Sequence, residues 1–165
     1  MFNNRISHLP LGEKIMDFKG TFEVGVSSND VYSFLMDPEK LSLCIPGLQK
    51  LDKVSDVEFI VLVRAGVAFI KDDFTIKFKL VESEVGKHAK FTGSGSGKSG
   101  TMDLVAVMDL IEASGKTTMN WSATVNVGGK IGSLGQRVMS SQAQKIIKQM
   151  FDSIDANLNG AKQKA

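Results

Sequence analysis

Residues 117–127 read TTMNWSATVNV, and this stretch decides the fold class. Polar side chains occupy alternate positions from Thr118 to Asn126, and apolar side chains fill the positions from Met119 to Val127. A repeat of two residues is typical of a β-strand that has one face in water and the other against a core. The stretch therefore predicts a strand of a sheet with one buried face.

The residues that follow this strand change to a helical repeat. From about residue 130 to residue 158 the apolar side chains fall on one stripe and most charged side chains lie off it. A helix of about 29 residues, at 1.5 Å per residue, spans roughly 40 Å and is long enough to cross a whole bent sheet. The stripe consists of Met139, Ala143, Ile146, Ile147, Met150 and Ile154.

The residues before 117 predict six further strands. Alternation starts at Met16 and continues to Val26. The breaks between the later runs are short and contain glycine, serine or acidic residues, so we expect hairpins and an antiparallel meander. In the run at residues 57–65, apolar residues occupy both faces, so the sequence does not decide which face points inward. The later runs are about 48–54, 57–65, 68–81, 87–95 and 101–112.

Two short helices are predicted between the first strand and the second. Ser27 and Asp37 each offer a capping side chain, and Pro38 suits the first turn of a helix. The resulting order is one strand, two short helices, six strands and one long helix. This order predicts an α+β, helix-grip fold, in which a curved antiparallel seven-stranded sheet wraps around the long C-terminal helix.

The composition of the 165 residues restricts the function classes. A net charge of +2 and the absence of an apolar run near the ~20 residues of a membrane span argue against a nucleic-acid binder and an integral membrane protein. One cysteine and a start without a signal-peptide core favour the cytoplasm. With only two histidines as well, we expect no metal site, no catalytic residues and no enzyme. We expect one domain over residues 16–158, between a poorly ordered arm at 1–15 and a tail at 159–165.

The glycine-rich stretch at residues 92–99, TGSGSGKS, ends like a phosphate-binding P-loop. Thr92 replaces the first glycine of that motif, and the residues after it alternate as a strand instead of starting a helix, so no nucleotide site is expected. We interpret residues 93–100 as a flexible hairpin tip that gates a cavity together with the turn at 46–47. A tip without any role explains the same glycines.

Four further side chains have simple structural interpretations. Asp72 and Asp73 are adjacent on a strand and point to opposite faces, so only one of them enters a cavity. We expect Asp72 to be a structural carboxylate with satisfied hydrogen bonds and Asp73 to be solvated. His88 shares a face with Lys90, which makes it a surface imidazole. Cys44 is expected to be a small buried hydrophobe.

Large, flexible apolar side chains gather at inward-facing positions, which favours a cavity. Five of the eight methionines fall on inward faces, and a thioether adapts to a bulky apolar guest. A bent sheet that grips a helix commonly leaves a space between the two, although ordinary core filling explains any single methionine. We predict an apolar cavity between the sheet and the long helix. Its predicted lining is Phe78, Phe91, Met108, Met119, Trp121, Met139, Ala143 and Met150.

Two motifs, in this order, resemble a known family. The first is DPEKL at residues 37–41 leading into CIPG at 44–47, and the second is VNVGGKIGSLGQR at 125–137. Both are similar to motifs of the carbon monoxide dehydrogenase G-subunit family, and the likeness extends over residues 16–158. That family belongs to the START-like (SRPBCC), helix-grip superfamily of hydrophobic-ligand binders.

The resemblance implies a non-catalytic accessory protein of a molybdenum-containing carbon monoxide dehydrogenase or related hydroxylase. It also implies a quinone or lipid as the bound guest, no covalent cofactor, and recruitment of the enzyme to the membrane. We expect a cytoplasmic protein with at most a peripheral, electrostatic contact with the inner face of the membrane. Two other interpretations stay open: an enzyme of the same superfamily, such as a cyclase or hydrolase, and an interaction module with an incidental cavity.

Overall fold

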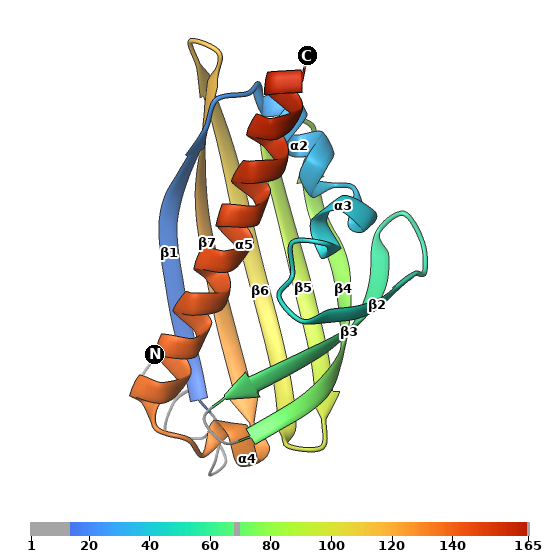
Figure 1. The fold of residues 1–165 in the computed structure, drawn as a ribbon, viewed down its shortest axis with the longest axis vertical. Helices are drawn as coiled ribbons and strands as arrows, with labels where there is room; N and C mark the ends of the chain where they lie inside the picture. Colours follow the sequence, from blue (N-terminus) through green and yellow to red (C-terminus); the bar gives the residue numbers. More distant parts are fainter. Residues whose placement is uncertain (1–13, 68–69, 165) are drawn as a thin grey trace.

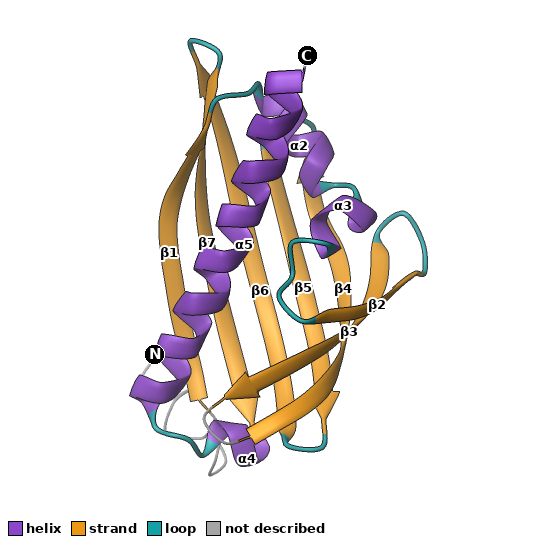
Figure 2. Ribbon diagram, in the orientation of Figure 1, coloured by secondary structure: helices purple, strands orange, loops and turns teal. Residues whose placement is uncertain are grey.

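A computed structural model describes residues 14–67 and 70–164 of the chain. Within these residues, seven strands form one antiparallel sheet, and a long helix lies across one face of it (Figures 1 and 2). This arrangement confirms the predicted α+β, helix-grip fold. The strands are β1 (Lys14–Val24), β2 (Leu48–Lys53), β3 (Glu58–Val67), β4 (Ile70–Glu84), β5 (His88–Gly97), β6 (Gly100–Ala113) and β7 (Lys116–Gly128). The helices are α2 (Ser28–Leu35), α3 (Pro38–Ser42), α4 (Gly129–Gly132) and α5 (Gln136–Lys164).

The strands are ordered β1-β7-β6-β5-β4-β3-β2 across the sheet. Strands β2 to β7 follow one another as the predicted meander, and β1 pairs with the far side of β7. β1 begins at Lys14, and the rest of the predicted arm lies outside the described residues. On β3, Phe59, Val61 and Val63 are buried, which settles the face that the sequence left open.

The two short helices begin at the predicted capping residues. The Ser27 hydroxyl oxygen accepts a hydrogen bond from the backbone N–H of Asp30 at 3.2 Å. A carboxylate oxygen of Asp37 accepts hydrogen bonds from the backbone N–H groups of Glu39 and Lys40 at 3.0 and 3.3 Å. Each cap satisfies backbone donors that the first helical turn leaves free.

The long helix differs from the prediction at both ends. Instead of one helix from about residue 130, the single turn α4 ends at Gly132 and α5 begins at Gln136. Glycine disfavours a helix by roughly 1 kcal/mol relative to alanine, and Gly132 and Gly135 flank the break. At its other end α5 continues to Lys164, so six residues of the predicted tail are helical.

The glycine-rich segment is a strand, so the prediction of a flexible tip is wrong outside the turn itself. Residues 93–97 belong to β5 and pair with β4 on one side and β6 on the other. A Cβ atom at Gly97 would lie 2.6 Å from a carboxylate oxygen of Asp72, and one at Gly95 would lie 2.8 Å from the side chain of Ile76. The glycines are required because neighbouring side chains of β4 lie over this backbone.

The second part of the predicted gate, the turn at Gly47, is also bonded to the sheet. Its carbonyl oxygen accepts a hydrogen bond from the backbone N–H of Arg64 at 2.8 Å. Gly47 has a φ of 79°, and a Cβ atom there would collide with the carbonyl oxygen of Arg64. This turn needs glycine for its geometry, so its glycine does not indicate a hinge.

The sheet curls so that strands from its two sides both reach α5. β1 is one edge of the sheet and β3 lies next to the other edge, and both approach α5. Figure 1 shows α5 crossing the sheet diagonally, with the hairpin of β3 and β4 bending towards the lower part of the helix. The sheet therefore grips the helix from both sides.

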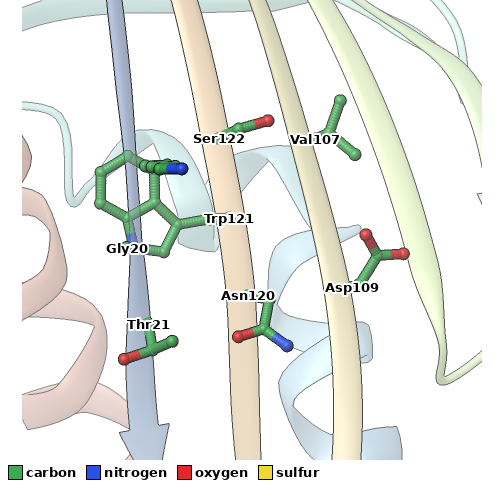
Figure 3. A pocket seen from close by; sticks show the side chains of 8 residues that line it. Gly20, Thr21, Val107, Asp109, Asn120, Trp121 and Ser122 are labelled. Carbon is green, nitrogen blue, oxygen red and sulfur yellow. The ribbon is translucent and has the colours of Figure 1, made fainter.

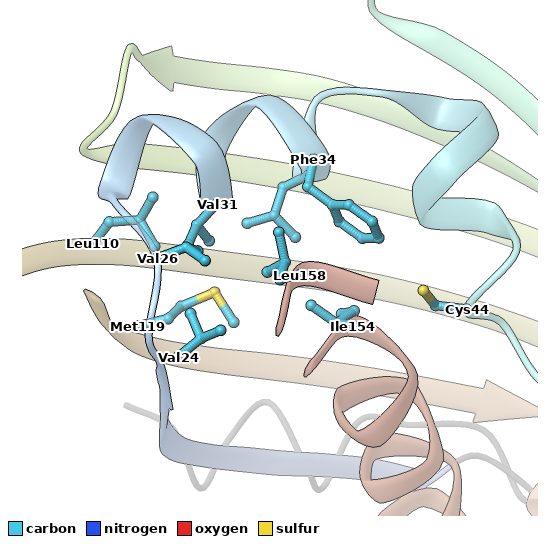
Figure 4. Packing of buried hydrophobic residues seen from close by; sticks show 10 residues of the cluster. Val24, Val26, Val31, Phe34, Cys44, Leu110, Met119, Ile154 and Leu158 are labelled. Carbon is cyan, nitrogen blue, oxygen red and sulfur yellow. The ribbon is translucent and has the colours of Figure 1, made fainter. Parts of the chain in front are cut away.

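The buried apolar residues of the described part of the chain form three clusters, and each cluster takes the name of an element that it contains. The α2 cluster, shown in Figure 4, consists of Val24, Val26, Val31, Phe34, Leu35, Cys44, Leu110, Met119, Ile154 and Leu158. The β3–β5 cluster consists of Phe59, Val61, Val63, Ile76, Ala89 and Phe91. The α4 cluster consists of Met16, Ile70, Val127, Ile131 and Met139. Cys44 is a buried free thiol within the first cluster, as predicted.

Candidate functional site

Helix α5 is fixed to the rest of the molecule at two places. Near its start, Met139 is buried in the α4 cluster. In its C-terminal half, Ile154 and Leu158 are buried in the α2 cluster, and Figure 4 shows them beside Phe34 of α2. Phe151 adds to the packing at this end, because its ring stacks on the ring of Phe22 of β1, with 4.9 Å between the centroids. Both ends of the helix are therefore packed tightly.

The middle of the same helical stripe is packed differently. Ala143, Ile146, Ile147 and Met150 are only half-buried and belong to none of the three clusters. They lie on the side of α5 that carries Met139 and Ile154, the side that faces the sheet. These four apolar side chains are therefore partly accessible to water.

The inner face of the sheet carries small side chains at one place. Across four neighbouring strands the inward-facing partners are Phe18 on β1, Ala123 on β7, Ala106 on β6 and Phe91 on β5. Two adjacent alanines therefore lie between two phenylalanines, and small side chains fill less space than their neighbours in this row. Ala106, Ala123 and the neighbouring Leu104 are half-buried and, like the middle of α5, belong to no cluster. We take this floor and the middle of α5 as the candidate site.

The predicted lining residues divide into two groups. Phe91, Met119 and Met139 are buried, each in a different cluster, and so fill the core. The half-buried members of the predicted set are Phe78, Met108, Trp121, Ala143 and Met150. The first three pack against the α2 cluster or the β3–β5 cluster, and the last two pack against none of the clusters. Ile146 and Ile147 belong to the predicted helical stripe but not to the predicted cavity, and the prediction also omitted Leu104 and Ala106, which alternate along β6 with exposed residues. The signal that was missed is small size: alanines mark the place where side chains leave room.

Trp121 joins the candidate site to the packed end of α5. Its ring lies 5.2 Å, between centroids, from the ring of Phe151. The same ring covers Gly20 of β1, where a Cβ atom would lie 3.0 Å from it, and Figure 3 shows it lying across that strand. Trp121 is half-buried and is the only tryptophan in the chain, so its fluorescence reports on this end of the site.

Among the described residues, those that form the candidate site include no titratable side chain. The one carboxylate that the sequence placed on the inner face, Asp72, lies further along β4 and is structural, as predicted. One of its oxygens accepts hydrogen bonds from the Ser99 hydroxyl at 2.6 Å and the Ser99 backbone N–H at 2.7 Å, and the other accepts one from the Asp73 N–H at 2.8 Å. The Ser99 hydroxyl and then its N–H hold the pKa of Asp72 below its ordinary value.

A shallow hollow of about 540 Å³ lies on the opposite face of the sheet, away from α5 (Figure 3). Its polar side chains alternate with the residues that face the helix, so this hollow and the candidate site lie on opposite faces of the sheet, and Trp121 is the one residue common to the two linings. It is lined by Lys19, Gly20, Thr21, Val107, Asp109, Asn120, Trp121 and Ser122.

His88 lies on this outer face, as predicted, and makes two ionic contacts there. One ring nitrogen lies 2.6 Å from a carboxylate oxygen of Asp109 and the other lies 3.0 Å from Glu82. Lys90 also pairs with Glu82, at 3.4 Å. The hydrogen bond with Asp109, followed by that with Glu82, raises the pKa of His88 above its ordinary value. This group is remote from the candidate site, since it lies on the other side of the sheet.

Two negative findings concern the described residues. No three of their histidine, cysteine, aspartate or glutamate side chains are grouped in a way that could hold a metal ion. None of the helices they form is both long enough and apolar enough to cross a lipid bilayer.

A curved seven-stranded antiparallel sheet gripping one long C-terminal helix defines the helix-grip class of fold. The chain belongs to the CoxG family, the G subunits of carbon monoxide dehydrogenase, whose model matches residues 20–159. No curated protein sequence matches the chain significantly.

Solved structures with the same fold extend over nearly the whole chain. A conserved protein from Geobacillus kaustophilus is 25% identical, with a TM-score of 0.83 over 88% of this chain and 97% of that one. A START superfamily protein from Mycobacterium smegmatis has a TM-score of 0.67 at 10% identity, over 88% and 98% of the two chains. An aromatase/cyclase from a Streptomyces species has a TM-score of 0.62 at 8% identity, over 88% and 94%. The last two likenesses concern the fold alone.

Proposed function

We propose that this chain is a non-catalytic accessory protein of a molybdenum-containing carbon monoxide dehydrogenase or a related hydroxylase, and that it holds a quinone or lipid between α5 and the sheet. The observation that carries the proposal is that the middle of α5 and the paired alanines Ala106 and Ala123 are half-buried apolar residues outside every packed cluster. Membership of a family named for a component of a dehydrogenase supports the enzyme partner.

The free energy of the apolar surface supports a hydrophobic guest. Burying apolar surface that water reaches contributes about 25 cal/mol for each Å². Ile146 and Ile147 on the helix and Leu104 on the floor offer such surface, and the thioethers of Met108 and Met150 adapt to the shape of a guest. An acyl chain would bury this surface without requiring a polar partner, whereas the two carbonyl oxygens of a quinone would need hydrogen-bond donors or water.

The proposed lining combines predicted residues with residues added from the packing. From the predicted set it retains Phe78, Met108, Trp121, Ala143 and Met150. It adds Leu104, Ala106, Ala123, Ile146 and Ile147. Phe91, Met119 and Met139 support the lining from within the core.

One observation favours a second candidate function, an enzyme of the same superfamily. The aromatase/cyclase mentioned above shares the fold. General acid or base catalysis requires a titratable side chain within reach of the substrate, and the proposed lining contains none. We therefore favour binding over turnover. We also propose a cytoplasmic location, with at most a peripheral contact with the inner face of the membrane.

A fluorescence titration tests the binding part of the proposal. Adding 2-methyl-1,4-naphthoquinone should quench the emission of Trp121 in a saturable way, because a quinone in the site lies near the indole ring. Free N-acetyltryptophanamide provides the control for collisional quenching and absorption by the quinone. Linear quenching equal to that of the control would contradict a quinone site, and a parallel titration with a single-chain phospholipid tests the lipid alternative.

Native mass spectrometry tests the partner and the absence of turnover. The protein should be purified together with co-expressed hydroxylase subunits, and the spectrum should contain a complex that carries an apolar guest of constant mass. A guest that is converted to a new mass during incubation with the isolated chain would support the enzyme instead.

A further inference from the structure

Three lysines surround a hollow at the end of the molecule where α4 lies. The hollow has a volume of about 310 Å³, and it is separate from the candidate apolar site. Figure 1 shows that α4, the turn between β5 and β6, and the start of β4 meet at this end. The hollow is lined by Ile70, Lys71, Asp72, Lys98, Ser99 and Lys130.

Ser99 holds the three lysine-bearing segments together. Its hydroxyl and its backbone N–H both donate to Asp72 of β4, the neighbour of Lys71. Its carbonyl oxygen accepts a hydrogen bond at 3.0 Å from the N–H of Ile131, the neighbour of Lys130. Ser99 itself is buried and follows Lys98. The backbone positions of the three lysines are therefore fixed relative to one another before any ligand arrives.

The charge of this hollow is not balanced by the protein. Within the described part of the chain, none of the three lysines has a carboxylate within ion-pair distance. Some lysines elsewhere on the sheet are paired, such as Lys77, which lies 3.1 Å from Glu58. The three lysines of the hollow differ from other unpaired lysines because they line one hollow together. Asp72 is the one carboxylate among the described residues that line the hollow, so three positive charges against one negative leave +2.

Ser99 cannot serve as the hydroxyl of a nucleotide-binding P-loop. Its hydroxyl and its N–H are both occupied by Asp72, and β6 rather than a helix follows the turn. Lysine ammonium groups remain as donors, each with three hydrogens and no preference for a planar ligand. They suit an anion that offers several oxygens in three dimensions.

We infer that this hollow binds a phosphate group. Inorganic phosphate carries up to two negative charges at neutral pH and offers enough oxygens for three ammonium donors, whereas the phosphodiester of a phospholipid headgroup carries one charge and two non-bridging oxygens. The phosphate is either free in solution or part of the headgroup of an anionic phospholipid. The inference does not depend on the apolar site, because no residue of the proposed lining takes part.

Two binding measurements test this inference and distinguish the two sources. The probes are inorganic phosphate, followed by calorimetry, and vesicles of phosphatidylglycerol, followed by co-sedimentation, with phosphatidylcholine vesicles for comparison. The test variant is Lys71→Gln/Lys98→Gln/Lys130→Gln. The control variant removes the same charge from exposed lysines elsewhere on the surface: Lys40→Gln/Lys116→Gln/Lys145→Gln.

Affinity should fall by about fivefold for each lysine removed from the hollow, roughly a hundredfold for three, and rising NaCl should weaken binding. The control variant should lose no more than a few-fold. Binding of inorganic phosphate identifies a site for free phosphate, and binding of phosphatidylglycerol vesicles alone identifies a headgroup site. No binding of either probe by the wild-type protein, or equal losses in the two triple variants, would overturn the inference. If the triple variant unfolds, Lys98→Gln alone, at the turn, should show the fivefold loss.

Discussion

The ends of α5 and its middle carry the same kind of side chain but are packed differently. Ile154 at one end and Met139 near the other are buried in clusters, whereas Met150 between them is half-buried and belongs to none. The repeat of apolar residues defines which side of the helix faces the sheet, but not how closely the sheet approaches. The sheet differs along its strands as well, because Ala106 and Ala123 pair in the middle of β6 and β7, whereas Met119 and Val127 are buried nearer the two ends of β7.

The largest expected difference in stability is between two methionine truncations, one in a packed cluster and one in the middle of α5. Met119 is 1% exposed, so Met119→Ala should lower the free energy of unfolding by about 2–5 kcal/mol, through lost burial and a new cavity. Met150→Ala should cost less than about 1 kcal/mol, because the space around that side chain is already open to water. Urea unfolding measures both. Equal losses would show that the middle of α5 is packed as tightly as the ends.

Glycine substitutions compare a constrained position with an open one. At Gly97 a Cβ atom would lie 2.8 Å from the carbonyl oxygen of Asp73 as well as close to Asp72, so Gly97→Ala should cost about 1–3 kcal/mol. At Gly135 nothing lies within 4 Å, so Gly135→Ala should change stability by less than about 0.5 kcal/mol. Thermal unfolding of the two variants measures the difference. If Gly97→Ala leaves stability unchanged, the segment is not constrained by its neighbours, and the predicted flexible tip would again explain its glycines.

A buried and an exposed hydroxyl on β7 provide the next comparison. The Thr117 hydroxyl, fully buried at the packed end, donates to the carbonyl oxygen of Val26 at 2.7 Å. Thr117→Val should cost about 1–3 kcal/mol, because it leaves that carbonyl without a partner away from water. Thr124→Val removes an equally short bond, to Asp17, on the exposed face and should cost under about 0.5 kcal/mol. Chemical denaturation that ranks the two in the opposite order would be inconsistent with the packing described here.

The smallest expected effect is a pH dependence on the outer face. The pKa of His88 is raised by Asp109 and then Glu82, so the stabilisation is fully present below the ordinary histidine pKa of about 6.5 and is lost as pH rises through the higher folded value. His88→Gln should therefore destabilise the protein more at pH 6 than at pH 9. Denaturant unfolding at these two pH values measures the difference, with Lys90→Gln as a control that leaves the imidazole in place. A loss that is the same at both pH values would mean that the imidazole is not held in its charged form.

Most of the fold was predictable because its signals are local. Alternation over residues 117–127 and the caps at Ser27 and Asp37 depend on neighbouring residues, and the structure confirms them. The break at Gly135 and the strand through Gly95 were missed. In the second case the glycine is explained by a side chain of another strand, and no local pattern contains that information.

The candidate site was less predictable, for a related reason. The parity of each strand correctly placed Met108 and Trp121 on the inner face. It did not reveal that Met119 is fully buried in a cluster while Ala106, which also faces inward, is only half-buried. That difference depends on which strands lie beneath the middle of α5 and on the pairing of two alanines, which only the register defines.

The central claim is that a guest binds on the floor beneath the middle of α5. The most direct test compares Ala106→Phe, which fills the floor, with Val107→Phe, which adds the same ring to the outer face one residue away. Each variant and the wild-type protein should be titrated with 2-methyl-1,4-naphthoquinone, with Trp121 emission as the signal and thermal unfolding as the check that both variants are folded. Ala106→Phe should abolish saturable quenching. Val107→Phe should leave the affinity for the quinone within about twofold of the wild type, because its ring lies on the opposite face of the sheet. Saturable quenching that survives in folded Ala106→Phe, or is lost equally in both variants, would contradict the account.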